Sequence, residues 1–166
     1  MFNQQPEIKL SLSKWDELLD IVSFAGLVLI WAFTIYFFMQ LPDIIPIHFD
    51  LKGNINRHGS KNILWIFPVL GSILVLGLTL LNRYPAIFNY PVKLTTQNVE
   101  RQYRLATRFI RVIKCGIVLV FLFCLAEIRI SAVDKNTHGM GMWYIFGILF
   151  FIISPVIVYL YFSFKK

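Results

Sequence analysis

Four long apolar segments, separated by polar stretches, dominate the pattern of residues along the chain. They cover residues 21–39, 63–81, 109–126 and 143–162. Each has 18 to 20 residues, and only the third contains charged residues, Arg111 and Lys114 in its first turns. A helix needs about 20 residues to cross roughly 30 Å of hydrocarbon. The pattern predicts an all-α integral membrane protein, a single four-helix membrane domain over residues 1–166.

The composition agrees with a membrane protein. The chain is 57% hydrophobic and only 15% charged, whereas charged residues make up about a quarter of a typical soluble domain. Ser13, followed by Asp16, predicts a capped helix that begins before the first apolar segment. Cys115 and Cys124 both fall in the third apolar segment, so we expect no disulfide framework.

The basic residues predict which way the chain crosses the membrane. With four spans, the N-terminal segment, the loop between spans two and three and the C-terminus share one side, which carries eleven of the 16 Lys and Arg residues. Loops rich in Lys and Arg stay in the cytoplasm. We therefore expect a multi-pass protein of the cell (inner) membrane with both termini cytoplasmic. The net charge of +7 then reflects topology and contact with the lipid bilayer, and nucleic acid is not an expected partner.

The stretch LPDIIPIHFDLKGNINRHGSK, residues 41–61, joins the first two apolar segments. Apolar and other residues alternate through 45–50, and a period of two predicts a short extended piece. Gly53 can adopt the positive φ that a turn requires, and Ser60 can cap the following helix. We expect a structured extracytoplasmic loop, in which His48 contacts a carboxylate and Lys61 reaches one such as Glu127. A packed connector remains the alternative to a working site.

A family resemblance adds to this interpretation. The stretch from about Val28 to Leu74 resembles the domain of unknown function 1648 family, which includes the SdpI-like immunity and signalling membrane proteins. The matching positions are Leu41, Pro42, Ile45, Pro46, His48, Phe49, Gly53 and Lys61. The resemblance implies a non-catalytic sensing or immunity-like protein that recognises an extracytoplasmic peptide. The candidate binding residues are Pro42, Pro46, His48, Phe49, Gly53 and Lys61.

A row of arginines precedes the third apolar segment. Arg101, Arg104, Arg108 and Arg111 share one face of a predicted helix, within a cytoplasmic loop and basic amphipathic helix over residues 83–114. Such a row attracts anionic lipid, by about 1 kcal/mol per basic side chain near the surface. The resemblance adds a second hypothesis, in which the row binds a cytoplasmic regulator.

Two further function classes remain open. A metal-dependent membrane enzyme or factor would use the histidines expected on the outer face, His48, His58 and His138, together with Glu127. Their spacing matches no zinc motif, and the chain has no hydrolase, metalloprotease or nucleotide-binding signature. We therefore expect no catalytic residue, metal or cofactor. The other class is a structural subunit of a membrane complex.

The orientation can be tested with reporters. A reporter fused after Lys166 and another inserted near Lys93 should both be cytoplasmic, whereas one inserted near Asn54 should lie outside. Alkaline phosphatase and green fluorescent protein fusions measure the two sides. The same side for Asn54 and Lys93 would contradict the four-span arrangement.

Overall fold

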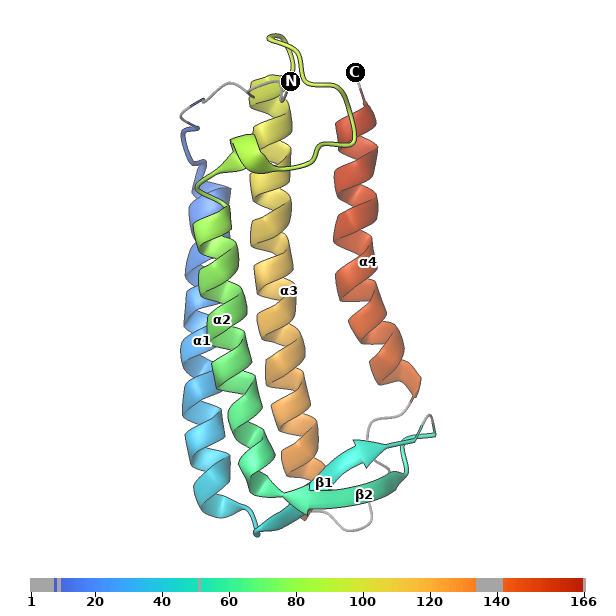
Figure 1. Cartoon of the computed structure of the whole chain (residues 1–166). Helices are drawn as coiled ribbons and strands as arrows, with labels where there is room; N and C mark the ends of the chain where they lie inside the picture. The colour runs from blue at the N-terminus through green and yellow to red at the C-terminus, as the bar shows by residue number, and fades with distance from the viewer. Residues whose placement is uncertain (1–7, 9, 51, 134–141, 166) are drawn as a thin grey trace.

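The computed structural model describes residues 8, 10–50, 52–133 and 142–165, with side chains of 142–145 outside the description. Four long helices and one two-stranded hairpin form the fold (Figure 1). In chain order the elements are α1 (Lys14–Gln40), β1 (Ile44–Phe49), β2 (Ile55–Ser60), the short 3-10 helix η1 (Lys61–Trp65), α2 (Ile66–Leu81), η2 (Pro85–Ile87), α3 (Val99–Val133) and α4 (Met142–Phe164).

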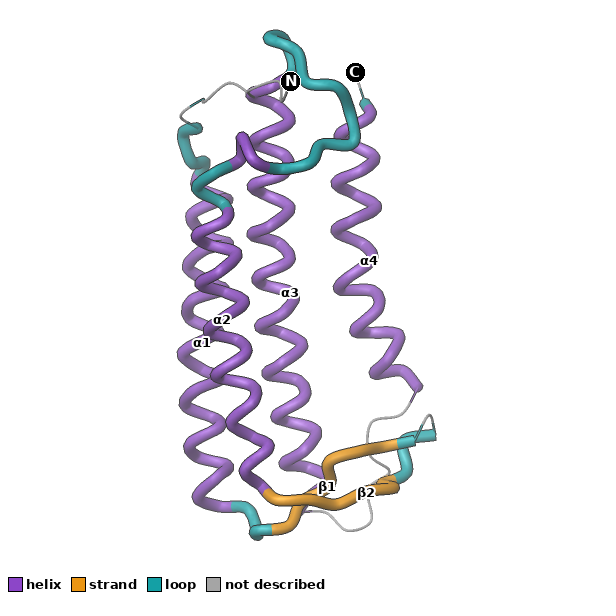
Figure 2. The backbone as a smooth tube through the Cα atoms, viewed as in Figure 1, coloured by secondary structure: helices purple, strands orange, loops and turns teal. Residues whose placement is uncertain are grey.

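The helices lie side by side, and the hairpin covers one end of them (Figures 1 and 2). The start of α1 and the end of α4 lie at the opposite end, which we call the terminal end, and the other is the hairpin end. α1 and α3 therefore run in the same direction and pack closely along their length. α4 packs against α3 and stands apart from α1 and α2 in this view.

The structure confirms the predicted fold class. Within the described residues, four helices are long and apolar enough to cross a membrane, with η1 and α2 together forming the second. α1 begins at Lys14 because Ser13 and Asp16 form the expected capping box. The loop differs from expectation in one respect, because its second half is also a strand. Residues 55–60 lack the alternating apolar pattern by which strands are recognised in sequence.

The core lies between α1, α2 and α3. It contains Ile30 from α1, Val75 from α2 and Leu125 from α3, all completely buried. Leu64 of η1 and Ile45 of β1 extend this core to the hairpin end. Large apolar side chains also cover the outer faces of the helices, as expected where lipid rather than water is the solvent.

α1 and α3 approach each other closely at Gly26. A Cβ at this position would collide with the Val118 side chain of α3. Small residues at such crossings let the two helix backbones approach, which maximises van der Waals contact in a membrane. By contrast, a Cβ at Gly77 of α2 would meet no atom within 4 Å.

Substitution at these two glycines tests the packing. Gly26→Leu should destabilise the protein by about 1–3 kcal/mol, because the side chain overpacks the α1–α3 contact. Gly77→Leu is the matched control and should leave stability unchanged or slightly raised. Unfolding in mixed detergent micelles measures both. Equal stability of the two variants would show that α1 and α3 do not meet at Gly26.

Candidate functional site

The hairpin at residues 41–61 contains all six predicted binding residues. β1 and β2 pair antiparallel, with Ile45 opposite Gly59, Pro46 opposite His58 and Phe49 opposite Ile55. The register shifts on both sides of His48. Such bulges turn side chains toward new directions and are common beside functional sites.

The turn of the hairpin is held by one carboxylate. Asp50 accepts backbone N–H bonds from Lys52 and Asn54, both at 2.8 Å, and a side-chain bond from Asn54 at 3.0 Å. These hydrogen bonds from Asn54 lower the pKa of the Asp50 carboxyl, so it is ionised at neutral pH. Gly53 has a φ of 87°, as its predicted role in the turn requires.

The hairpin is anchored to the helix ends. Ile45 is fully buried, and β1 packs against α3. Lys61 ties the two ends of the hairpin together, because its Nζ lies 3.1 Å from Asp43 Oδ1 and 3.2 Å from the Leu41 carbonyl. Lys61 thus reaches a carboxylate, as expected, but the carboxylate is that of Asp43 and not that of Glu127.

The six predicted residues occupy different environments. Pro46 is buried, Phe49 and Lys61 are partly buried, and Pro42 and His48 are exposed. His48 Nδ1 lies 2.6 Å from Asn56 Oδ1, so its partner is an amide and not the carboxylate that we expected. Pro46, Gly53 and Lys61 therefore shape the hairpin, whereas His48 faces outward. That these residues bind a ligand stays a prediction.

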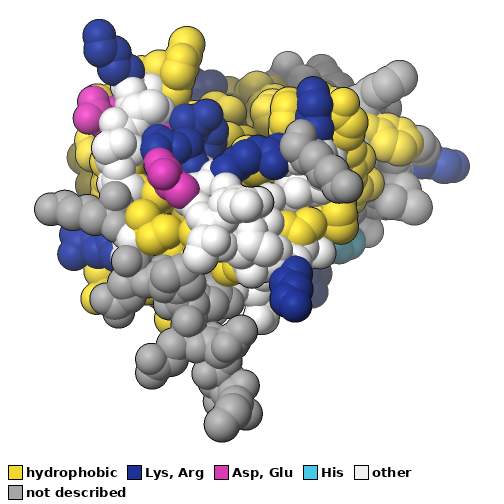
Figure 3. Space-filling model, turned by 90° about the horizontal axis from the view of Figure 1, so that it is seen from above, with side chains coloured by type: hydrophobic (Ala, Val, Ile, Leu, Met, Phe, Trp, Pro, Cys, Tyr) yellow, Lys and Arg dark blue, Asp and Glu magenta, His cyan; other side chains and the backbone are white. Residues whose placement is uncertain are grey.

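The arginine row lies at the terminal end, where basic side chains gather on the surface (Figure 3). Arg108 Nε bonds Asp16 Oδ1 at 2.8 Å, and Arg111 Nε bonds Asp20 Oδ2 at 2.9 Å. Arg104 pairs with Glu100 at 3.0 Å within α3, and Arg101 donates to the Phe162 carbonyl of α4 at 2.7 Å. The arginine row thus contacts α1 and α4, and parts of its side chains remain exposed. Its contact with lipid or a regulator stays a prediction.

Two residues important to this end were missed from the sequence. The sequence pattern gives Asp16 only a capping role and gives Asp20 none, yet they receive Arg108, Arg111 and Lys114 from α3. Lys114 is fully buried, with Nζ 2.5 Å from Asp20 Oδ1 and 2.9 Å from Thr79 Oγ1. The spacings show only that the two acids share one face of their helix and that the three bases share one face of theirs; they do not show that the two faces meet.

Only part of the predicted histidine cluster lies within the residues that the structure describes. His48 and His58 lie on neighbouring strands of the hairpin, whereas Glu127 is a partly buried residue of α3. His138 lies outside the described residues. Within the residues described, no three His, Cys, Asp or Glu side chains come together in a way that would hold a metal ion.

The segment that contains the hairpin is similar to a known protein family. Residues 25–71 match the domain of unknown function (DUF1648). The match runs from α1 through the whole hairpin into α2. An uncharacterized protein of Archaeoglobus fulgidus is similar, with 35% identity over 74 residues, covering 40% of this chain and 40% of that protein. The chain thus spans less than half of this relative's length, and no solved structure matches.

The hairpin should lose its order when the turn is strained. Gly53→Val places a β-branched residue at positive φ, which costs roughly 1–3 kcal/mol locally. Trypsin added to the purified protein should then cut rapidly after Arg57, which the ordered wild-type hairpin protects. Lys52→Val is the matched control, because it adds the same side chain at an exposed neighbouring position. Rapid cutting after Arg57 in the wild type would show a mobile linker.

Proposed function

We propose that this chain is a non-catalytic protein of the cell membrane whose hairpin recognises an extracytoplasmic ligand. The observation that carries the proposal is the two-sided construction of the hairpin. One side packs against the helix ends through Ile45 and Ile47. The other presents polar side chains on strands held in a fixed register.

Charge indicates the kind of ligand. Both acids of the hairpin have partners within it, Asp43 with Lys61 and Asp50 with the turn. Among the residues described, no ion pair engages Lys52 or Arg57, and both side chains are exposed, as are His48 and His58. With Lys52, Arg57 and Lys61 against Asp43 and Asp50, the hairpin carries a net positive charge. An acidic peptide or an anionic component of the cell envelope fits it best.

A preformed surface also suits recognition energetically. The Asp50 turn and the Lys61–Asp43 pair fix the hairpin before a ligand arrives. Less conformational entropy is then lost on binding than with a flexible loop. This is the physical basis for a sensing or immunity-like role, in which ligand capture at the hairpin end is transmitted to the cytoplasmic terminal end through α2 and α3.

At the terminal end, a lipid or a cytoplasmic regulator would meet the exposed parts of Arg101 and Arg104, which also bond the Phe162 carbonyl and Glu100. Arg108 and Arg111 are already engaged by Asp16 and Asp20. The two alternative classes predict different behaviour. A metal-dependent factor would bind zinc stoichiometrically through its histidines, and a structural subunit would keep its partners whatever the state of the hairpin.

Site-specific photo-cross-linking in cells tests recognition at the hairpin. A photoreactive amino acid in place of Arg57 should give a discrete adduct with an extracytoplasmic component, and Gly53→Val in the same chain should abolish it. The same amino acid in place of Leu76, exposed on α2, is the control and should label lipid. Adducts that persist in the Gly53→Val background, or none at all, would contradict recognition by the folded hairpin.

A further inference from the structure

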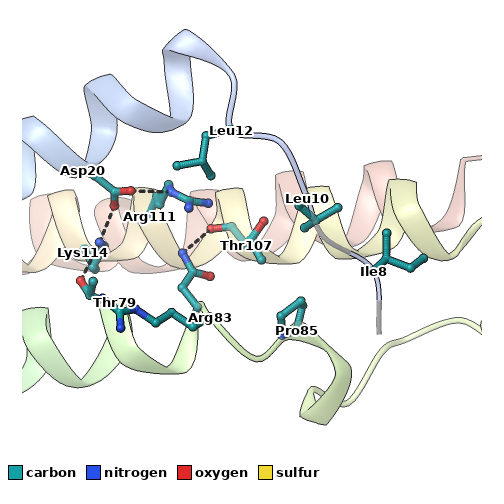
Figure 4. Close-up of a pocket in the computed structure, with 11 residues that line it drawn as sticks. Ile8, Leu10, Leu12, Asp20, Thr79, Arg83, Pro85, Thr107, Arg111 and Lys114 are labelled. Carbon is teal, nitrogen blue, oxygen red and sulfur yellow. Dashed lines mark hydrogen bonds and ion pairs between the residues drawn. The ribbon is translucent and has the colours of Figure 1, made fainter. Parts of the chain in front are cut away.

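A cavity at the terminal end has a lining unlike the rest of the bundle (Figure 4). Its volume is about 450 Å³, and it lies among α1, α2, α3 and the segment that precedes α1. Polar lining comes from Asp20, Thr79, Asn82, Arg83, Thr107, Arg111 and Lys114. Ile8, Leu10, Leu12 and Pro85 supply the apolar remainder.

Among the lining residues that the structure describes, cations outnumber acids. Arg83, Arg111 and Lys114 face one carboxylate, that of Asp20. Asp20 receives Nε of Arg111 and Nζ of Lys114, which leaves the other guanidinium nitrogens of Arg111 available to a ligand. The side chain of Arg83 makes no hydrogen bond or ion pair with the residues described. Counted over the described lining residues, three cations and one acid leave an excess of two positive charges.

Hydrogen bonds hold the side chains and backbone around these cations in place. Thr79 Oγ1 donates to the Val75 carbonyl at 2.7 Å and accepts from Lys114. Asn82 Nδ2 donates to the Thr107 carbonyl at 3.0 Å, which joins α2 to α3 beside the cavity. Pro85 is held by the Tyr90 hydroxyl, which donates to its carbonyl at 2.9 Å. Burial raises the pKa of Tyr90, so this hydroxyl keeps its proton at neutral pH.

The position of the cavity, near the end of α2, indicates which class of ligand could bind there. Thr79 lies in the last turn of α2, and Arg83 follows that helix directly. The end of a membrane-spanning helix lies near the lipid headgroups, where phosphate is the common anion. Guanidinium groups bind phosphate oxygens through paired, charge-assisted hydrogen bonds.

From this geometry we propose that the cavity binds a phosphate group, supplied either by a lipid headgroup or by free phosphate. Arg83 and Arg111 would bind its oxygens, with Lys114 adding charge from behind. The apolar side chains of the lining suit a headgroup whose glycerol and first acyl carbons enter with the phosphate. The site is independent of the hairpin, since it lies at the other end of the bundle.

Calorimetric titration of the whole protein in a maltoside detergent, without phosphate in the buffer, tests this. Inorganic phosphate and dihexanoyl phosphatidylglycerol are titrated separately, with dihexanoylglycerol as the probe that lacks phosphate. We expect saturable binding of at least one phosphate probe. Binding of inorganic phosphate identifies the free anion, and binding of the phospholipid alone identifies the headgroup.

Three variants separate a binding site from a purely structural ion-pair cluster. Arg83→Gln should weaken phosphate binding about tenfold or more, as the loss of a charge-assisted bond predicts. Lys93→Gln, in the same loop but outside the cavity lining, should bind like the wild type. Asp20→Asn should bind more tightly, because it removes the carboxylate that repels the anion; if it fails to fold, the comparison of Arg83→Gln with Lys93→Gln decides. No binding of either phosphate probe, equal binding by Arg83→Gln and the wild type, or equal binding of dihexanoylglycerol would overturn the proposal.

Discussion

The charge of Lys114 is the constraint on which the arrangement of the helices depends. This side chain is fully buried in a helix that is long and apolar enough to cross a membrane. An uncompensated ion in such surroundings costs several kcal/mol, and its attraction to a partner repays that cost only with good geometry. Asp20 of α1 and Thr79 of α2 supply the geometry. One ammonium group thus determines how three helices meet.

Fixing α1 against α3 at the terminal end has consequences far along both helices. α1 and α3 run in the same direction, so an offset of one turn at Asp20 would displace every later contact by about 5.4 Å. Gly26 would then no longer face Val118, and the small residue would be in the wrong place. Ile45 of the hairpin shares the core with Leu125 and Ile128 of α3. The position at which the hairpin packs on α3 therefore depends on ion pairs at the opposite end of the molecule.

The features that could be predicted from the sequence depend on residues that are close together in the chain. The features that could not be predicted depend on contacts between distant residues. Apolar runs, the Ser13–Asp16 cap and the Gly53 turn are local, and all three appear as expected. β2 was hidden because its residues Asn56, Arg57 and His58 face outward and lack the alternation that marks a strand. Its partner strand, not its composition, makes it a strand.

The ion pairs were hidden for the same physical reason. Asp16 and Arg108 are 92 residues apart, and each has an adequate local explanation as a helix-terminal acid or a cytoplasmic base. When each charge is explained separately, one overlooks that an acid and a base near the same end of two adjacent helices can form an ion pair. Both ends of the molecule then follow one rule. Asp43 pairs with Lys61 and Asp20 with Lys114. Arg57 at the hairpin and Arg83 at the cavity form no ion pair with the residues described, and they are the cations that the two proposed sites would use. The positive net charge thereby becomes available at two separate surfaces without leaving a buried acid unpaired.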